Sequence, residues 1–158
     1  MKKLSILMAG LLLLGLCSCG TTAETQPEPS ESAEAAAEQE EQVIYEDQYV
    51  KVVFQGIDAL HFVEGMSVVN VTLTNLSEQE ITVLPMDSFV NDTMVQFTSG
   101  APATMLGGKT MNYAMSFSNQ TAGITDYSEI TKLGFSVSVN DADFHEVSRS
   151  EVLTVEAK

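Results

Sequence analysis

The chain has few of the side chains that metal binding and nucleophilic catalysis require. It has only two cysteines, Cys17 and Cys19, both near the N-terminus, and only two histidines, His61 and His145. The sequence beyond residue 42 therefore has no disulfide, cysteine-based metal site or cysteine nucleophile. The histidines lack the spacing of a ligand pair, and neither a Gly-x-Ser-x-Gly motif nor a phosphate-binding loop is present. We therefore expect neither an enzyme nor a bound cofactor.

Basic residues are also scarce. From residue 43 onward, fifteen Asp and Glu stand against four Lys and one Arg, which leaves a net charge of about −10. Nucleic acids and anionic lipid head groups are bound through clusters of Lys and Arg. We therefore expect no nucleic-acid partner, and we interpret the negative charge as an aid to solubility.

No apolar run is long enough to cross a membrane. The longest, Leu4–Leu16, has thirteen residues, whereas a membrane-spanning helix needs about 20. Lys2 and Lys3 precede this run, and a positive start followed by a short apolar stretch is typical of a signal peptide. Residues 1–18 are therefore predicted to be a signal peptide.

The end of this segment, Leu16-Cys17-Ser18-Cys19, resembles the lipobox of bacterial lipoproteins. In that motif a small residue directly precedes the lipidated cysteine and an aliphatic residue stands three positions before it. Cys19 matches this pattern, whereas the bulky leucine before Cys17 does not. The resemblance implies cleavage before Cys19 and attachment of acyl chains such as palmitate, which would hold the protein to the extracytoplasmic face of the cell membrane. An ordinary secretory peptide with two incidental cysteines is the alternative.

Residues 19–42 form an acidic stretch between the lipidation site and the rest of the chain. It has seven Glu, no Lys or Arg, and no aromatic or large aliphatic residue. Such a composition cannot bury enough apolar surface to offset chain entropy, so we predict a disordered tether. Repulsion between like charges extends such a chain and holds the next domain off the membrane. An acidic interaction tail is the alternative.

Residues 43–158 have the length of one domain and the pattern of short strands separated by polar turns. We expect strands at 49–57, 68–74, 80–84, 88–95 (two, around an Asn91-Asp92 turn), 110–118, 133–139 and 144–155, with a short helix or turn between 119 and 130. About seven strands in this length favour an all-β, antiparallel, immunoglobulin-like β-sandwich. The Cys…Trp…Cys framework of antibody domains is missing, so the expected core is Val, Leu, Phe and Met.

Four strand-and-turn motifs carry a family resemblance. They are Val71-Thr72-Leu73-Thr74 with Ile81-Thr82-Val83 after a polar turn, Val90-Asn91-Asp92-Thr93-Met94, Gly107-Gly108-Lys109 before an alternating strand, and Ala122-Gly123-Ile124 with Ile130-Thr131-Lys132-Leu133-Gly134-Phe135. Together they resemble a domain that recurs in lipoproteins of Clostridia-type bacteria. The family favours Gly where this chain has Asp92, and Asp tolerates the same left-handed turn. The resemblance implies an immunoglobulin-like accessory domain of unknown role and no catalytic residue.

Two aromatic residues in expected loops are the candidates for partner binding. Phe62 lies in loop 57–65 and Tyr127 in loop 119–129, and aromatic side chains are enriched at binding hot spots. Burial beneath its own loop is the alternative for each. The predicted function is therefore a non-enzymatic domain that binds a protein, peptide or glycan. A structural or envelope-homeostasis module without a dedicated ligand is the alternative.

A polar turn near the C-terminus is the one weak candidate for a metal site. Asp141 and Asp143 lie there beside Asn140, His145 and Glu146. Their oxygens suit Ca²⁺, which takes about six to eight oxygen ligands. A solvated hairpin turn is the alternative. Met111 and Met115, which fall on one strand face, are interpreted as core residues rather than as copper ligands, because Met fills irregular gaps.

Overall fold

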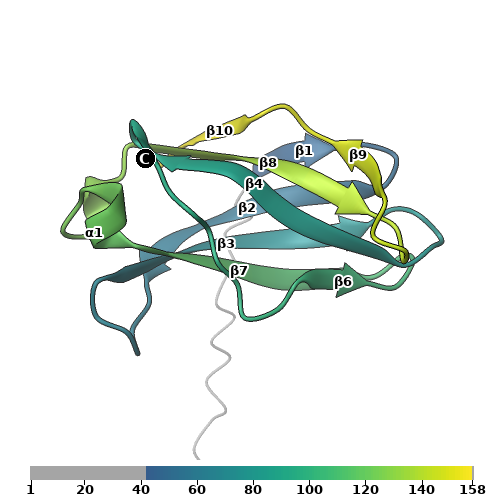
Figure 1. The fold of residues 1–158 in the computed structure, drawn as a ribbon, viewed down its shortest axis with the longest axis horizontal. Helices are drawn as coiled ribbons and strands as arrows, with labels where there is room; N and C mark the ends of the chain where they lie inside the picture. Colours follow the sequence, from purple (N-terminus) through teal and green to yellow (C-terminus); the bar gives the residue numbers. More distant parts are fainter. Residues whose placement is uncertain (1–41, 158) are drawn as a thin grey trace, which may run out of the picture. The chain divides into compact units, whose positions relative to one another are not determined.

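The computed structural model drawn in Figure 1 describes residues 42–157 of the chain. The predicted signal peptide, Cys19 and the acidic tether as far as residue 41 lie outside the described residues. The expectations about cleavage, lipid attachment and the tether therefore stay predictions. Among residues 42–157, neither of the two short helices is long and apolar enough to cross a membrane.

The first sheet, sheet A, has four antiparallel strands in the order β1-β2-β3-β7. Its strands are β1 (Gln42–Glu46), β2 (Val50–Ala59), β3 (Met66–Asn75) and β7 (Thr110–Ser118). Strand β3 shows why the sequence forms it: Val69, Val71 and Leu73 are buried, whereas Asn70 and Thr72 between them face outward. Such alternation suits a strand with one face on a core.

The second sheet, sheet B, is built around β8 and has the order β10-β8-β4-β5, with β6 paired to β4 and β9 paired to β8. Its strands are β4 (Ile81–Val90), β5 (Thr93–Met94), β6 (Ala103–Met105), β8 (Lys132–Asn140), β9 (Glu146–Arg149) and β10 (Leu153–Glu156). Helix α1 (Asn119–Ala122) and a 3₁₀ turn, η1 (Tyr127–Glu129), connect β7 to β8.

The strand order confirms the predicted immunoglobulin-like β-sandwich. Strands β2, β3 and β7 lie side by side in one sheet, and β4, β8 and β10 lie side by side in the other. In chain order these six strands match A, B, C, E, F and G of the immunoglobulin fold, where A, B and E share one sheet and C, F and G share the other. Figure 1 shows the two sheets stacked, with α1 at one end and β6 at the other.

The number of strands differs from the prediction of about seven, because the described residues form ten. Strand β1 begins at Gln42, which the charge pattern assigned to the tether. Strand β6 was not predicted, because three residues are too few for their alternation to be distinguished from chance. The single expected strand at 144–155 is two strands, interrupted at residues 150–152. Strand β4 continues past Pro85. The pairing of β4 with β6 ends at Val83, so the N–H that Pro85 lacks interrupts no hydrogen bonds on the β6 side of the strand.

Phe97 connects the inner faces of the two sheets. Its ring centroid lies 5.5 Å from that of Phe117 on β7 and 5.9 Å from that of Phe135 on β8. Met115 is also buried in this core, as the interpretation of the methionines predicts. Tilted aromatic pairs at these separations add to the stabilisation that burial provides.

The polar face of β8 is buried as well, which the alternation of the sequence did not predict. Ser136 and Ser138 are 1% and 4% exposed because charged side chains lie over them. Ser136 donates to Asp87 Oδ2 at 2.8 Å, and Arg149 donates to the same oxygen at 2.7 Å. The hydrogen bond from Arg149, with help from that of Ser136, holds the pKa of Asp87 below its usual value. The small side chains of Ser136 and Ser138 thus leave room for the charged side chains that lie over them.

Candidate binding sites

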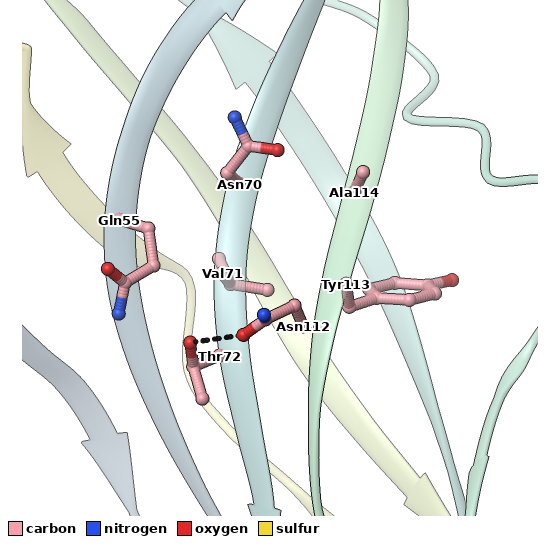
Figure 2. Close-up of a pocket in the computed structure, with 7 residues that line it drawn as sticks. All are labelled: Gln55, Asn70, Val71, Thr72, Asn112, Tyr113 and Ala114. Atoms are coloured by element: carbon pink, nitrogen blue, oxygen red, sulfur yellow. Dashed lines mark hydrogen bonds between the residues drawn. The ribbon is translucent and has the colours of Figure 1, made fainter.

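A shallow hollow lies on the outer face of sheet A, away from the core. Its volume is about 340 Å³, and β2, β3 and β7 all contribute to it. The residues that line it, drawn in Figure 2, are Gln55, Asn70, Val71, Thr72, Asn112, Tyr113 and Ala114. Because the three strands are fixed by the sheet ladder, the backbone positions from which the polar side chains of this hollow project are set before any ligand arrives.

Small side chains and one irregularity in β2 explain the hollow. Ala114 stands opposite Asn70 in the pairing of β3 with β7. On the other side of Asn70, β2 has a bulge, and Gly56 is the residue in register with it. Gly56 has φ of 132°, a conformation that side chains rarely adopt, and a Cβ there would meet nothing within 4 Å. The residues beside Asn70 on the two neighbouring strands are therefore a glycine and an alanine, whose small size leaves the hollow open.

The polar groups of the hollow are only partly satisfied by one another. Thr72 donates to Asn112 Oδ1 at 3.0 Å, the hydrogen bond drawn in Figure 2. The side-chain amides of Gln55 and Asn70 make no hydrogen bond to any other residue in the described part of the chain. Each amide offers both donors and an acceptor. The hollow can therefore hydrogen-bond a neutral polar ligand.

The hollow is neutral in a strongly acidic domain. None of its seven lining residues is charged, although the domain has a net charge of about −10. The alternation of the sequence placed Asn70, Thr72, Asn112 and Ala114 on the faces opposite the apolar residues of their strands, and it did not identify them as a site. A run of uncharged polar residues on neighbouring strands was the available signal, but recognising it requires the pairing of β3 with β7.

The two predicted aromatic anchors differ in exposure. Phe62, in the loop between β2 and β3, is 83% exposed and is followed by Val63, which is 43% exposed. It therefore remains available for a partner. Tyr127, in η1, is half-buried and packs against the core. The alternative of burial beneath its own loop thus describes Tyr127 better than it describes Phe62.

The predicted acidic turn brings three possible ligands together. One ligand atom from each of Asp141, Asp143 and His145 lies within 4.8 Å of the other two. Asp141 Oδ1 already accepts the backbone N–H groups of Asp143 and His145, both at 2.9 Å. The backbone N–H of His145 is the main cause that holds the pKa of Asp141 below its usual value. The turn hydrogen bonds explain the grouping by themselves, and Ca²⁺ binding stays a prediction.

Comparison with known proteins gives a fold similarity alone. No protein-family model matches the sequence, and no curated protein matches it. The structure is similar to the GAE domain of GGA2p from Saccharomyces cerevisiae, with 13% identity and a TM-score of 0.46 over 75% of this chain and 96% of that one. It is also similar to the yeast GGA1 GAE domain, with 10% identity and a TM-score of 0.40 over 73% and 96%.

Proposed function

We propose that the chain is a lipid-anchored extracytoplasmic protein whose β-sandwich binds a protein, peptide or glycan partner and catalyses no reaction. The neutral polar hollow on sheet A is the observation that carries the proposal. Gln55 and Asn70 present free amide groups from neighbouring strands. Such amide groups suit the hydroxyl and peptide groups of glycans and polypeptides, which are neutral and form directional hydrogen bonds.

The exposed loop between β2 and β3 supports the same proposal. Phe62 has little contact with the rest of the domain, so its apolar ring is free to be buried against a partner. The backbone N–H of Asn119, at the start of α1, donates to Gly65 O at 2.9 Å. This bond holds one end of the loop against the helix, which limits the entropy lost when a partner orders it.

The lipobox motif and the acidic stretch support the proposed location. The motif at Cys19 fits a lipid anchor, and the stretch that follows would separate the sandwich from the membrane. The strand-and-turn motifs support a place for the chain among Clostridia-type accessory lipoproteins. Such an anchor would keep the binding faces of the sandwich within reach of partners in the envelope.

The anchor is tested by membrane fractionation of cells that produce the Cys19→Ala protein. We expect the variant to leave the membrane fraction, because it has no thiol to carry the lipid. Globomycin, which blocks the lipoprotein signal peptidase, should cause the unprocessed precursor to accumulate. Unchanged membrane retention and normal processing in both experiments would refute the anchor, whatever the sandwich binds.

Partner binding is tested by photo-crosslinking in the producing cells. A photoreactive amino acid replaces Asn70 in the full-length protein, and a second protein has it at Thr154, an exposed position on β10 in the other sheet. We expect a defined adduct at residue 70 and none at residue 154. Equal labelling at both positions would refute the hollow as the site. No adduct at either position would favour the structural module without a dedicated ligand.

A further inference from the structure

Strand β7 is the edge of sheet A, and its outer side is only partly covered. In the described range, 42–157, Thr98 is the one residue that pairs with β7 on the side away from β3. Ser116 N–H donates to Thr98 O at 2.7 Å, and Thr98 N–H donates to Ser116 O at 2.8 Å. The backbone groups of Ser116 therefore point to the outer side of the sheet.

Alternation along the strand sets the direction of the neighbouring backbone groups. Residues two apart on a strand direct their N–H and C=O groups to the same side, so Ala114 and Asn112 point outward with Ser116. Side-chain contacts between β3 and β7 agree with this direction. Thr72 donates to Asn112, and the hydroxyl oxygens of Thr74 and Thr110 lie 3.0 Å apart. Side chains approach this closely in pairs whose backbones do not bond each other, so the backbone groups of Asn112 and Thr110 point away from β3. Two further pairs of outward N–H and C=O groups thus lie beside the bridge.

The segment that could have covered these groups turns away. After Thr98 the chain passes over the side chain of Tyr113, whose hydroxyl donates to Ser99 Oγ at 2.5 Å and to Ala101 O at 3.3 Å. Pro102 then follows and has no N–H to give to a ladder. Asn112 and Ala114 are left exposed, and Figure 2 shows Ala114 beside the hollow.

The edge has none of the usual protection against strand addition. Strand β7 contains no charged residue and no proline, and its pairing with β3 has no bulge. The opposite edge, β1, is short, ends in Glu46 and has a shift in register between Val43 and Tyr45. Natural proteins guard edges with charge, proline, bulges or shortness. Sheet A therefore guards one edge and leaves the other open.

We propose that the edge at Asn112 and Ala114 binds an extended segment of a partner protein, which adds to sheet A as an antiparallel strand. The existing bridge at Thr98 is antiparallel and sets this direction. Alternate side chains of the added strand then lie on the outer face, and the methyl group of Ala114 leaves the way into the hollow open. The inference rests on the proposed function and specifies its partner.

Charge and geometry select a neutral or basic partner segment over two other occupants. A second copy of this domain brings another net charge of about −10, which opposes pairing. The chain's own acidic stretch has seven Glu, a residue depleted in strands. It also joins the sandwich at Gln42, where β1 forms the opposite edge of the sheet. An uncharged edge in an acidic domain is best complemented by neutral residues with basic ends.

The test uses a synthetic probe of alternating Thr and Val with Lys at both ends, added to the full-length protein in detergent micelles. Hydrogen–deuterium exchange should slow about tenfold at the amides of Asn112 and Ala114, because each becomes hydrogen-bonded. The same probe with N-methyl groups on alternate residues cannot bond the edge, and we expect it to give no slowing. Protection located elsewhere, or equal effects of both probes, would overturn the proposal.

A substitution in the protein, in place of a change in the probe, tests the same hydrogen bonds. Ala114→Pro removes one outward N–H at a position where an edge strand tolerates proline, and we expect the dissociation constant of the probe to rise about fivefold or more. Thr154→Pro, at an exposed position on β10 in the other sheet, is the matched control, and we expect it to leave the constant unchanged. A change below about twofold in the folded Ala114→Pro variant would overturn the proposal. Should the Ala114→Pro variant not fold, the methylated probe decides.

The outcomes separate this inference from the proposed function. A cellular adduct at residue 70 together with no probe binding at the edge would refute strand addition and leave the binding function standing. No cellular adduct together with probe binding at the edge would refute the proposed function as it occurs in the cell. Protection of Asn112 that rises with protein concentration in the absence of probe would assign the edge to a second copy and overturn the proposal.

Discussion

Asn75 is a buried polar residue whose replacement should destabilise the whole sandwich. It is 0% exposed and ends β3. Its side-chain amide donates to Gln79 O at 2.8 Å and to Met105 O at 3.1 Å, and its Oδ1 accepts the N–H of Ser77 at 2.9 Å and the Ser77 hydroxyl at 2.8 Å. One side chain thus joins the end of β3, the turn into β4, and strand β6.

The cost of Asn75→Ala follows from what each partner loses. Gln79 is exposed, so water replaces the bond to its carbonyl at little cost. Met105 is 4% exposed, so water does not readily replace the donor that its carbonyl loses, and we assign this loss about 1–3 kcal/mol. The N–H and hydroxyl of Ser77 lose about 1 kcal/mol together, because Ser77 is half-buried and partly hydrated. We expect a total near 3 kcal/mol, a large part of the typical 5–15 kcal/mol of a domain.

Urea unfolding of residues 20–158, followed by far-ultraviolet circular dichroism, measures this loss. In a domain of this size about 3 kcal/mol corresponds to a fall in Tm of about 12 °C. Leu76→Ala is the matched control, because this neighbour is 45% exposed and should change the free energy of unfolding by less than about 0.5 kcal/mol. A loss below about 1 kcal/mol for Asn75→Ala would refute the reasoning.

Asn75→Asp separates hydrogen bonding from packing, because the two side chains have nearly the same shape. A carboxylate cannot donate to the carbonyl groups of Gln79 and Met105, and it adds a buried negative charge beside them. We expect at least the loss seen with alanine at pH 7. Protonation restores one donor, so the deficit should shrink as the pH falls. A deficit independent of pH would show that packing, not donation, is what Asn75 supplies.

Three further predictions follow from the described geometry. Gly134→Ala should destabilise by about 1–3 kcal/mol in urea unfolding, because a Cβ there would lie 2.4 Å from Leu153 O, whereas Gly100→Ala, with nothing within 4 Å, should be neutral. Burial alone would raise the pKa of Asp47, but hydrogen bonds from Ser148 and two backbone N–H groups outweigh it and place the pKa below its usual value. Asp47→Ala should therefore lose about 2 kcal/mol at pH 7. Because the folded pKa lies below the unfolded value of about 3.9, the part of this loss that depends on the charge is present above that value and disappears as the pH falls through the folded pKa, which unfolding curves at several pH values will check. If the acidic turn binds Ca²⁺, the ion will raise the Tm of the unchanged protein but not that of Asp141→Ala, and equal responses would end the metal prediction.

The alternation of side chains predicted four of the five long strands, whereas β4 was expected as two separate strands. Strands β2, β3, β7 and β8 lie where period-two patterns placed them, because each has one face on a core. The short strands are too short for a pattern to decide: β6 has three residues and was not predicted, and β5 has two and was predicted only from the turn before it. The partner strand, rather than the local sequence, determines them.

The position of the turn after Asn75 was predicted from the sequence, but the burial of the Asn75 side chain was not. The sequence predicted a turn after Asn75, since Asn bonds its own backbone two residues on, and the bond from Ser77 N–H is that interaction. The bond to Met105 O comes from a strand thirty residues away, and it explains why the residue is buried. Phe62 and Tyr127 illustrate the same limit, because the same prediction was made for both and only the packing of η1 distinguishes them.

The strongest functional feature of the sequence is a local absence of charge, and only the fold shows its meaning. The chain has 22 Asp and Glu, yet β7 has none of them and no Lys or Arg. The side chains of Asn112 and Ala114 point away from the core, so a lysine at either position would guard the edge without disturbing a buried contact. Solubility and resistance to aggregation both favour such a charge. An edge that forgoes it, beside a hollow lined with free amide groups, is better explained by a partner strand than by packing inside the domain.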